Sequence, residues 1–392
     1  MVGIADVARR AGVSTATVSA VLNGTRYVSP ERTQAVQRAV ADLRYTPNGL
    51  ARSLAQQRSG LVGLIVPSLL NPIYPDIVHA VQRVIDAAGY ALILAQSDDR
   101  AGQERAASEL LRLRRVEGVI VAPSSVRNLD VLHDFHRVGA PVVLLNRRLA
   151  GPPFDRVVVD HATAVHDAVR HLVALGRRRI ALLALPNYAS AATGEREGRR
   201  IGYRAALREA GLPEVSVVCA GPPHHAAQRS VLDLLDGPEP PDALIASNPP
   251  MTLGALEALR SLGRRIPAEV ALVGYGDLPW TRFIDPPLTV VDGAFEAVGQ
   301  RAAELLVERL AGAGPEASTE ITVPAHLVVR ASTAGHAPRD SQPTPPRPVS
   351  RSIDPPGAPG PVRPLPTRRR PPRRLAQVGP TPPDPEGGTR FP

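Results

Sequence analysis

Hydrogen-bonding side chains gather near the start of the chain, in the stretch STATVSAVLN at residues 14–23. Ser14 stands where a helix N-cap belongs, because its hydroxyl can accept the backbone N–H groups left unpaired in a first helical turn. One face of the helix that follows is apolar, and the other presents small hydroxyl and methyl groups. Such a helix can contact base edges in a major groove. The side chains we expect there are Ser14, Thr15, Ala16, Thr17, Ala20 and Asn23.

The neighbouring residues predict two further helices that would position this one. Apolar residues recur at helical spacing from Ile4 to Ala11, and Gly12 follows as a stop. A third helix begins at Ser29-Pro30-Glu31, with Ser29 as cap and Pro30 in the first helical position. The arrangement is that of a helix-turn-helix. Periodicity alone leaves open a small helical bundle with no DNA role.

From about Gly60 onward, short apolar runs alternate with amphipathic stretches, which predicts buried parallel strands with helices between them. Four runs come first and four follow later, so we expect two doubly wound α/β subdomains. Ligands of such sheets bind at the carboxyl ends of the strands, here in the cleft between the subdomains. The runs are residues 61–67, 90–96, 116–123, 141–146, 180–185, 215–220, 242–247 and 270–276.

Composition excludes several classes of protein. All 46 basic residues are arginine, so neither a phosphate loop with lysine nor a Schiff-base enzyme is possible. Cys219 is the single cysteine, and no cysteine and histidine set has metal-ligand spacing. We find no GxSxG, HExxH or three-glycine dinucleotide motif. No signal segment or membrane-length apolar run is visible, so we expect a cytoplasmic protein with no membrane partner.

The formal charge of +9 lies at the two ends of the chain. Residues 1–58 hold eight arginines against three acidic residues, and a basic head suits phosphate binding. Residues 336–392 are rich in proline and arginine and are expected to be disordered. This tail either attracts DNA without sequence preference or is a neutral extension.

Eight stretches of the chain are distinctive in their wording and order: DVARRAGVS, ATVSAVLN, YVSPERTQAV, YTPNGLARSL, GLIVPSLLNPIY, RRVEGVIVAPSS, GYRAALREAGL and DPPLTVV. Through them the chain resembles the LacI-type (lactose/galactose repressor) family of bacterial transcription regulators over about residues 2–333. The resemblance implies a DNA-binding repressor that acts as a homodimer on a pseudo-palindromic operator, with a small-molecule effector in the cleft of a core like that of periplasmic sugar-binding proteins. We expect no cofactor, no metal and no enzymatic activity.

The words around PNGLARSL imply a hinge helix, capped by Asn48, that is about two turns long and marginal on its own. In the family two such helices pack in the minor groove and push a leucine, here Leu54, between base pairs. Ala51 and Arg52 lie on the same short helix. The expected domains are therefore a headpiece at 1–47, a hinge at 48–59, a core at 60–335 and a tail at 336–392.

The resemblance also carries effector-binding positions onto this chain: Tyr74, Asn146, Arg147, Asp160, Arg199, Asn248 and Asp277. Three positions depart from the family pattern, because Asn146, Pro249 and Gly276 stand where aspartate is usual. Carboxylates bind sugar hydroxyls in pairs, so their loss beside arginines favours an anionic or otherwise modified effector, or loss of effector response. Drift among sugar binders that use other contacts is the alternative.

Two further interpretations depend on single features. Ala20 offers only a methyl group where many relatives carry a longer side chain, so base reading would depend more on Thr15 and on DNA shape. A periplasmic-type solute-binding protein without a DNA role would explain the core but not residues 1–58. An enzyme on a doubly wound sheet is the third class, and no motif supports it.

Overall fold

The computed structural model describes residues 2–24, 26–45, 58–124, 129–146, 154–184, 195–219, 223–314 and 317–334. Contacts divide the chain into residues 1–339 and residues 340–392. The expected hinge helix and the expected disordered tail lie outside the described residues. Within the described ranges, no helix is long and apolar enough to cross a membrane.

The headpiece has the three predicted helices, α1 (Ile4–Ala11), α2 (Thr15–Asn23) and α3 (Pro30–Asp42). Gly12 ends α1 with a φ of 66°, and the Ser14 hydroxyl accepts the Thr17 N–H at 3.1 Å. These helices close over a small core of Val7, Ala8, Val18, Val36 and Ala39.

Ser29 occupies the N-cap position of α3, as predicted, but its side chain makes no cap hydrogen bond to a backbone N–H of that helix. Its hydroxyl instead bonds the Glu31 carboxylate. The pKa of Glu31 is lowered first by a backbone hydrogen bond within its own residue and next by this Ser29 contact. Pro30 does occupy the start of the helix, as predicted.

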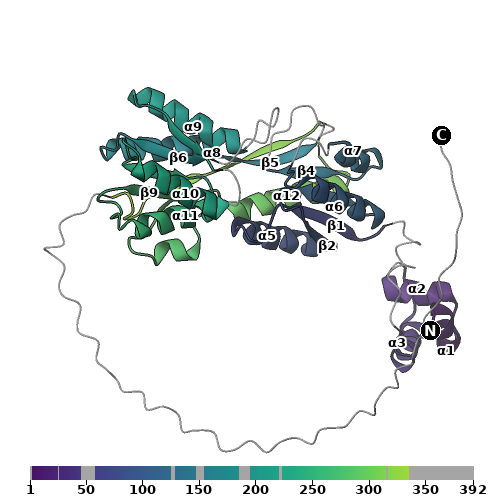
Figure 1. Cartoon of the computed structure of the whole chain (residues 1–392). Coiled ribbons are helices and arrows are strands. Elements are labelled where there is room, and N and C mark those ends of the chain that lie inside the picture. Colours follow the sequence, from purple (N-terminus) through teal and green to yellow (C-terminus); the bar gives the residue numbers. More distant parts are fainter. Residues whose placement is uncertain are drawn as a thin grey trace, which may run out of the picture. The chain divides into compact units, whose positions relative to one another are not determined.

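The first α/β subdomain is built on a six-stranded sheet in the order β11-β5-β4-β3-β1-β2 (Figure 1). All its neighbouring strands are parallel. The strands are β1 (Leu61–Val66), β2 (Ala91–Gln96), β3 (Gly118–Val121), β4 (Val142–Leu145), β5 (Asp155–Asp160) and β11 (Glu320–Pro324). The helices are α5 (Ile73–Ala87), α6 (Ala101–Leu113), α7 (Leu129–Arg137) and α12 (Phe295–Leu310).

The second subdomain repeats this plan with the order β12-β10-β9-β8-β6-β7, in which only β12 runs antiparallel to its neighbour. Its strands are β6 (Ile180–Ala184), β7 (Val215–Val218), β8 (Ala243–Ala246), β9 (Ala271–Tyr275), β10 (Thr289–Asp292) and β12 (His326–Val328). Its helices are α8 (His161–Ala174), α9 (Glu195–Ala210), α10 (Pro223–Asp236), α11 (Pro249–Ser261) and the short η2 (Pro279–Arg282).

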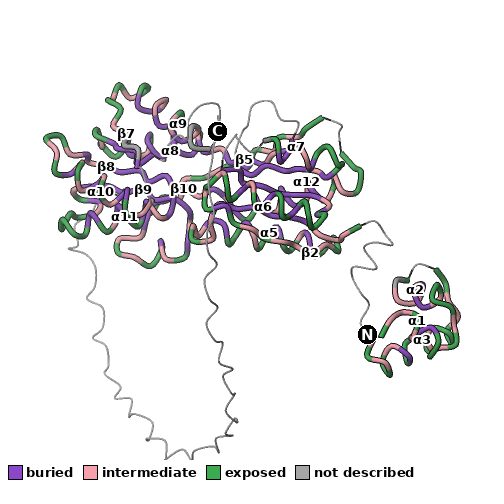
Figure 2. Tube along the Cα trace, turned by 45° about the vertical axis from the view of Figure 1, so that its right-hand side comes forward, coloured by how far each residue is buried: buried purple, intermediate pink, exposed green. Residues whose placement is uncertain are grey.

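Each sheet carries helices on both faces, and its central strands are buried, as a doubly wound fold requires (Figure 2). The eight predicted apolar runs all contain strands of the structure. Sequence reasoning did not list β5, β10, β11 and β12 as strands. These four strands flank the places where the chain passes between the subdomains, namely β5 to α8, β10 to α12 and β11 to β12.

Pairs of helices approach closely at glycines. A Cβ built on Gly299 of α12 would lie 2.5 Å from the Ile77 carbonyl oxygen of α5. One built on Gly202 of α9 would lie 2.0 Å from the Ala162 carbonyl oxygen of α8. Backbone atoms cannot move aside as a side chain can, so these positions set how closely the helices pack.

We therefore expect Gly299→Ala to lower the free energy of unfolding by about 1–3 kcal/mol, through overpacking against α5. Gly102→Ala in α6 is the matched control, because a Cβ there meets nothing within 4 Å and alanine favours helix. Urea unfolding followed by circular dichroism compares the two. Equal stability of both variants would contradict the close contact.

Candidate functional site

The first turn of α2 exposes part of the predicted DNA-contacting set. Ser14, Thr15 and Ala16 are exposed, and Thr17 is half-buried. The hydroxyls of Ser14 and Thr17 bond each other at 2.9 Å, so these two side chains cap the helix. Thr15 and Ala16 are exposed in the same turn, so their side chains are accessible to an outside surface.

Ala20 differs from the prediction that it lies on the outward face, because only 3% of its surface is accessible. It shares a helix face with the exposed Ala16, four residues earlier, but its small methyl group is covered by its surroundings. The burial leaves Thr15 and Ala16 as the better candidates for base contact. The side chain of Asn23 and the hinge residues Ala51, Arg52 and Leu54 lie outside the described residues.

A second exposed feature of the headpiece was missed from the sequence. Tyr27 is 87% exposed in the loop between α2 and α3, beside the exposed Arg26. An aromatic residue left in solvent is a signal that only the structure supplies, since sequence patterns would assign Tyr27 to core packing as readily.

Three buried side chains meet where the chain passes between the subdomains. The Tyr275 hydroxyl, at the end of β9, hydrogen bonds Nδ1 of His161, the first residue of α8. The Arg199 guanidinium carbon of α9 lies 4.4 Å from the centroid of the Tyr275 ring. His161 and Tyr275 are each 1% exposed and Arg199 is 3% exposed. A cation stacked on an aromatic face in a desolvated position is held firmly.

Phe295, which begins α12, extends this cluster. Its ring centroid lies 6.3 Å from that of Tyr275. The cluster of His161, Arg199, Tyr275 and Phe295, here termed the junction, therefore joins two of the crossing points. Only Arg199 of the four was predicted.

Asn146 is buried at the carboxyl end of β4, where parallel α/β sheets hold ligands. It is 3% exposed and has a φ of 54°, in the left-handed region that asparagine tolerates. Neither amide atom has a hydrogen-bond partner among the described residues. A buried amide without partners is costly, so Asn146 is suited to meet a polar group of a ligand. Its neighbour Arg147 lies outside the described residues.

Tyr74 lies in the first turn of α5 and is 8% exposed. It is a member of the large hydrophobic cluster that includes residues of both subdomains. The structure thus gives Tyr74 a packing role, and its predicted stacking on a ligand ring stays a prediction.

Asp160 and Asn248 both cap helices. The Asp160 carboxylate accepts the Thr163 N–H at 3.1 Å and the Thr163 hydroxyl at 2.7 Å, at the start of α8. Oδ1 of Asn248 accepts the Met251 N–H at 2.8 Å, at the start of α11. Such caps fix helix starts at the strand ends. The acceptor atoms are therefore partly used before any ligand binds.

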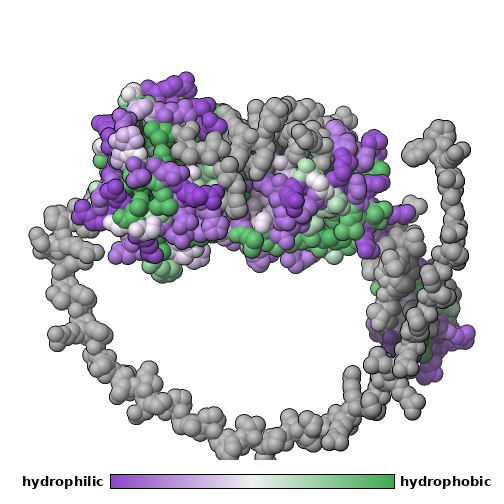
Figure 3. Space-filling model, in the orientation of Figure 1, coloured by the Kyte–Doolittle hydropathy of each residue, from purple (hydrophilic) through white to green (hydrophobic). Residues whose placement is uncertain are grey.

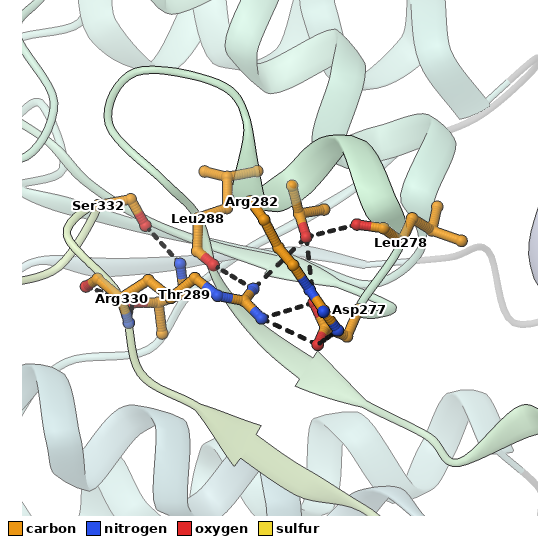
Figure 4. A network of polar contacts seen from close by, with 8 residues as sticks. Asp277, Leu278, Arg282, Leu288, Thr289, Arg330 and Ser332 are labelled. Carbon is orange, nitrogen blue, oxygen red and sulfur yellow. Dashed lines mark hydrogen bonds and ion pairs between the residues drawn. The ribbon is translucent and has the colours of Figure 1, made fainter.

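Asp277 is committed to the protein itself (Figure 4). Arg330 donates to both of its oxygens, at 2.7 and 2.8 Å, and Arg282 donates at 2.8 Å. The Thr281 hydroxyl adds a contact at 3.1 Å. Burial alone would raise the pKa of Asp277, but the hydrogen bonds from Arg282 and Arg330 outweigh it and lower the pKa. We therefore assign Asp277 a structural role in place of the predicted ligand contact.

The Asp277 network ties the loop after β9 to the last described segment of the core. Arg330 also donates to the Leu288 carbonyl at 2.9 Å. The Ser332 hydroxyl accepts the Thr289 N–H at 2.8 Å and donates to the Leu272 carbonyl at 2.6 Å. Ser332, Thr289 and Thr281 are all fully buried. The sequence analysis did not predict a role for Arg330. Arg330 begins the stretch RAST shortly after a strand, and an arginine followed closely by two hydroxyl residues there could have indicated a hydrogen-bonding contact to the core.

No group of three or more histidine, cysteine or acidic side chains within the described ranges could hold a metal ion. A surface cavity of about 400 Å³ is lined by Arg204, Leu207, Arg208, Leu212 and Glu214. It contains none of the predicted ligand residues.

Comparison with known proteins connects these parts. Residues 3–48 match the model "Bacterial regulatory proteins, lacI family", and residues 169–333 match "Periplasmic binding protein-like domain". The HTH-type transcriptional repressor PurR of Pectobacterium carotovorum is 33% identical over 339 residues, covering 85% of this chain and 97% of PurR. The ribose operon repressor of Halalkalibacterium halodurans is 31% identical, over 86% of this chain and 98% of that repressor.

Solved structures give the same picture. A crystal structure of the Lac repressor dimer bound to operator and the anti-inducer ONPF has a TM-score of 0.74 and 27% identity, covering 85% of this chain and 99% of that one. A complex of the transcriptional regulator CelR with cellobiose has a TM-score of 0.62 and 31% identity, covering 85% and 100%.

We expect Asp277→Asn to lower the free energy of unfolding by about 1–3 kcal/mol near pH 7, because two arginines lose a charged acceptor. The folded-state pKa is depressed, so the stabilisation is present above the unfolded pKa of about 3.9 and is lost as the pH falls below it. The stability difference between wild type and variant should therefore shrink below about pH 4. Urea unfolding at several pH values measures it.

Asp233→Asn, at an exposed position of α10, is the control for the loss of one carboxylate. A difference for Asp277→Asn that is no larger than this control, or that does not change with pH, would contradict the assigned role.

Proposed function

This chain belongs to the lacI family of bacterial regulatory proteins, and we propose how its parts divide the work of a DNA-binding repressor that a small molecule modulates. The headpiece, residues 1–47, reads double-stranded operator DNA. The core, residues 60–335, binds the small molecule between its two subdomains and pairs with a second copy. We assign the protein to the cytoplasm and give it no catalytic step.

One observation carries the DNA-reading role. A capped helix presents the exposed Thr15 and Ala16 on a head with a surplus of arginine. Arginines supply phosphate attraction without sequence preference, and the first turn of a helix in the major groove supplies the sequence reading. Residues 48–59 would then act as the hinge, with Leu54 as a wedge between base pairs and Ala51 and Arg52 beside it.

The second copy has exposed apolar surface to cover. Leu253 of α11 is 44% exposed and Phe283, directly after η2, is 85% exposed. In the first subdomain the edge strand β2 carries Leu94, 38% exposed, and Leu70 is 92% exposed. Apolar side chains reach the surface of both subdomains in the view of Figure 3. We propose that these side chains form a two-fold dimer interface, which a pseudo-palindromic operator would match.

The ligand site is proposed at Asn146 and Arg199, with Arg147 following Asn146 in the sequence. Asn146 brings an amide without partners among the described residues, and Arg199 brings a buried positive charge. Asp160 and Asn248 already cap helices and Tyr74 packs in the large hydrophobic cluster, so these predicted ligand residues keep fewer free contacts for a ligand. Because Asp277 is tied to two arginines, it adds no available carboxylate. This chemistry favours an anionic or acid-modified sugar over a neutral hexose.

The DNA-reading role is tested by Thr15→Asp, which places a negative charge on the exposed first turn of α2. The charge suits the helix terminus, so the head should stay folded, but it opposes DNA. From a random duplex library at fixed salt, the full-length wild type should enrich one sequence, and the variant should not. Gln37→Asp, at an exposed position of α3, changes the charge equally and should retain the enrichment. Enrichment by Thr15→Asp as strong as by wild type would refute this role of α2.

The ligand class is tested by isothermal titration calorimetry with glucose, glucose 6-phosphate and gluconate. We expect a charged compound to bind at least about tenfold more tightly than the neutral sugar, because charge-assisted hydrogen bonds to arginine are the stronger ones. Arg199→Gln should remove the preference. Tight binding of unmodified glucose would overturn the proposed class and leave the DNA-reading role untouched.

A further inference from the structure

Glu117 holds the first residues of the core, at the point where the chain arrives from the headpiece. Its Oε1 accepts the Gly60 N–H at 2.7 Å, and its Oε2 lies 3.4 Å from Nε of Arg58. The Glu117 side chain is 14% exposed, whereas that of Arg58 is 63% exposed. A single carboxylate therefore contacts two residues of the incoming segment, directly before β1.

The backbone around Gly60 is fixed from both sides. The Gly60 carbonyl accepts the Ala91 N–H of β2 at 2.8 Å, and the Leu61 carbonyl accepts the Glu117 N–H at 2.8 Å. Gly60 has a φ of 69°, which glycine adopts without strain. The chain thus turns at Gly60 and enters the sheet between β2 and β3 in one defined direction.

The Glu117 contacts are the side-chain part of this anchor. Backbone pairing fixes Gly60 through its carbonyl and the residues after it, but among the described residues it does not reach Arg58. The last described headpiece residue before Arg58 is Tyr45, so the segment joining headpiece to core ends at the residues that Glu117 holds. A charged acceptor for a backbone N–H is among the stronger single hydrogen bonds.

We propose that Glu117 is a positioning residue for DNA binding: by holding Arg58 and Gly60, it fixes where the linker leaves the core. The inference rests on the proposed function, because it concerns how two headpieces are presented to one operator. In a dimer, two linkers that start at fixed points limit the spacing of the headpieces, and a fixed spacing favours a site with two matched halves. Binding to a random duplex does not require two matched half-sites, so a fixed spacing of the headpieces does not raise that affinity.

Glu117 also moves with the first subdomain as a rigid part of it. The residue directly precedes β3, and the other end of that strand leads to Ser124, whose N–H is held by the buried Glu104. A short strand paired on both sides does not bend, so any rotation of this subdomain carries the linker origin with it. A change in the relative orientation of the subdomains would therefore change the distance between the two linker origins, and with it the spacing of the headpieces.

The test uses full-length Glu117→Ala and Glu117→Gln. The probe is the duplex that the wild-type full-length protein enriches from a random library, with a random-sequence duplex as the non-specific probe. Glu269→Ala is the matched control in the second subdomain, because the Glu269 carboxylate likewise accepts a backbone N–H, that of Arg265 at 3.0 Å, and pairs with arginine side chains, Arg265 at 3.0 Å and Arg264 at 3.3 Å. Fluorescence anisotropy at fixed salt measures the dissociation constants, and sedimentation and thermal unfolding check dimer and fold.

For Glu117→Ala we expect the affinity for the enriched duplex to fall by about tenfold or more. Its affinity for the random duplex, its dimerisation and its thermal unfolding should match those of Glu269→Ala. Glu117→Gln keeps one oxygen for Gly60 and should lose less, and this variant carries the test if Glu117→Ala does not fold. Enriched-duplex affinity of Glu117→Ala within twofold of wild type, or an equal loss in Glu269→Ala, would overturn the proposal. A wild type that enriches no duplex would instead reject the proposed function.

Discussion

The structure depends on the three passages of the chain between its two α/β subdomains. A single passage would act as a free linker, whereas three passages side by side confine the subdomains to a limited relative rotation. Two of them are joined by the buried junction of His161, Tyr275, Arg199 and Phe295. The proposed ligand residues Asn146 and Arg199 come from opposite subdomains. A ligand that contacts both residues would favour one relative orientation of the two subdomains. Its binding energy would then shift the protein toward that conformation.

The sequence predicted most of the fold, because parallel strands buried on both faces read as apolar runs. Four strands were not predicted. β11 and β12 are largely exposed or half-buried and lack that signal, whereas β5 and β10 are buried but contain only three and two consecutive valines. The first turn of α2 was predicted with its cap, as a local pattern. Ser29 shows the limit of local reasoning. Its hydroxyl can bond either a backbone N–H of α3 or the Glu31 carboxylate, and the sequence pattern does not distinguish these two partners.

The candidate site was harder to predict than the fold. Family resemblance indicated Asn146, and the structure adds that its amide is buried without partners among the described residues. It also indicated Asp277, but the decisive contact is with Arg330, 53 residues further along the chain. His161 and Tyr275 are 114 residues apart. Such pairs exist only once the strands are in register, so spacing along one sequence does not reveal them.

In the proposed mechanism, the relative orientation of the two core subdomains determines the affinity of the headpiece for its operator. The most direct test titrates the enriched duplex with the full-length protein, in the absence and in the presence of the small molecule that most raises the unfolding temperature of the core. We predict a change in the dissociation constant of about fivefold or more for that duplex and none for a random duplex. Equal affinity with and without a saturating ligand would contradict it.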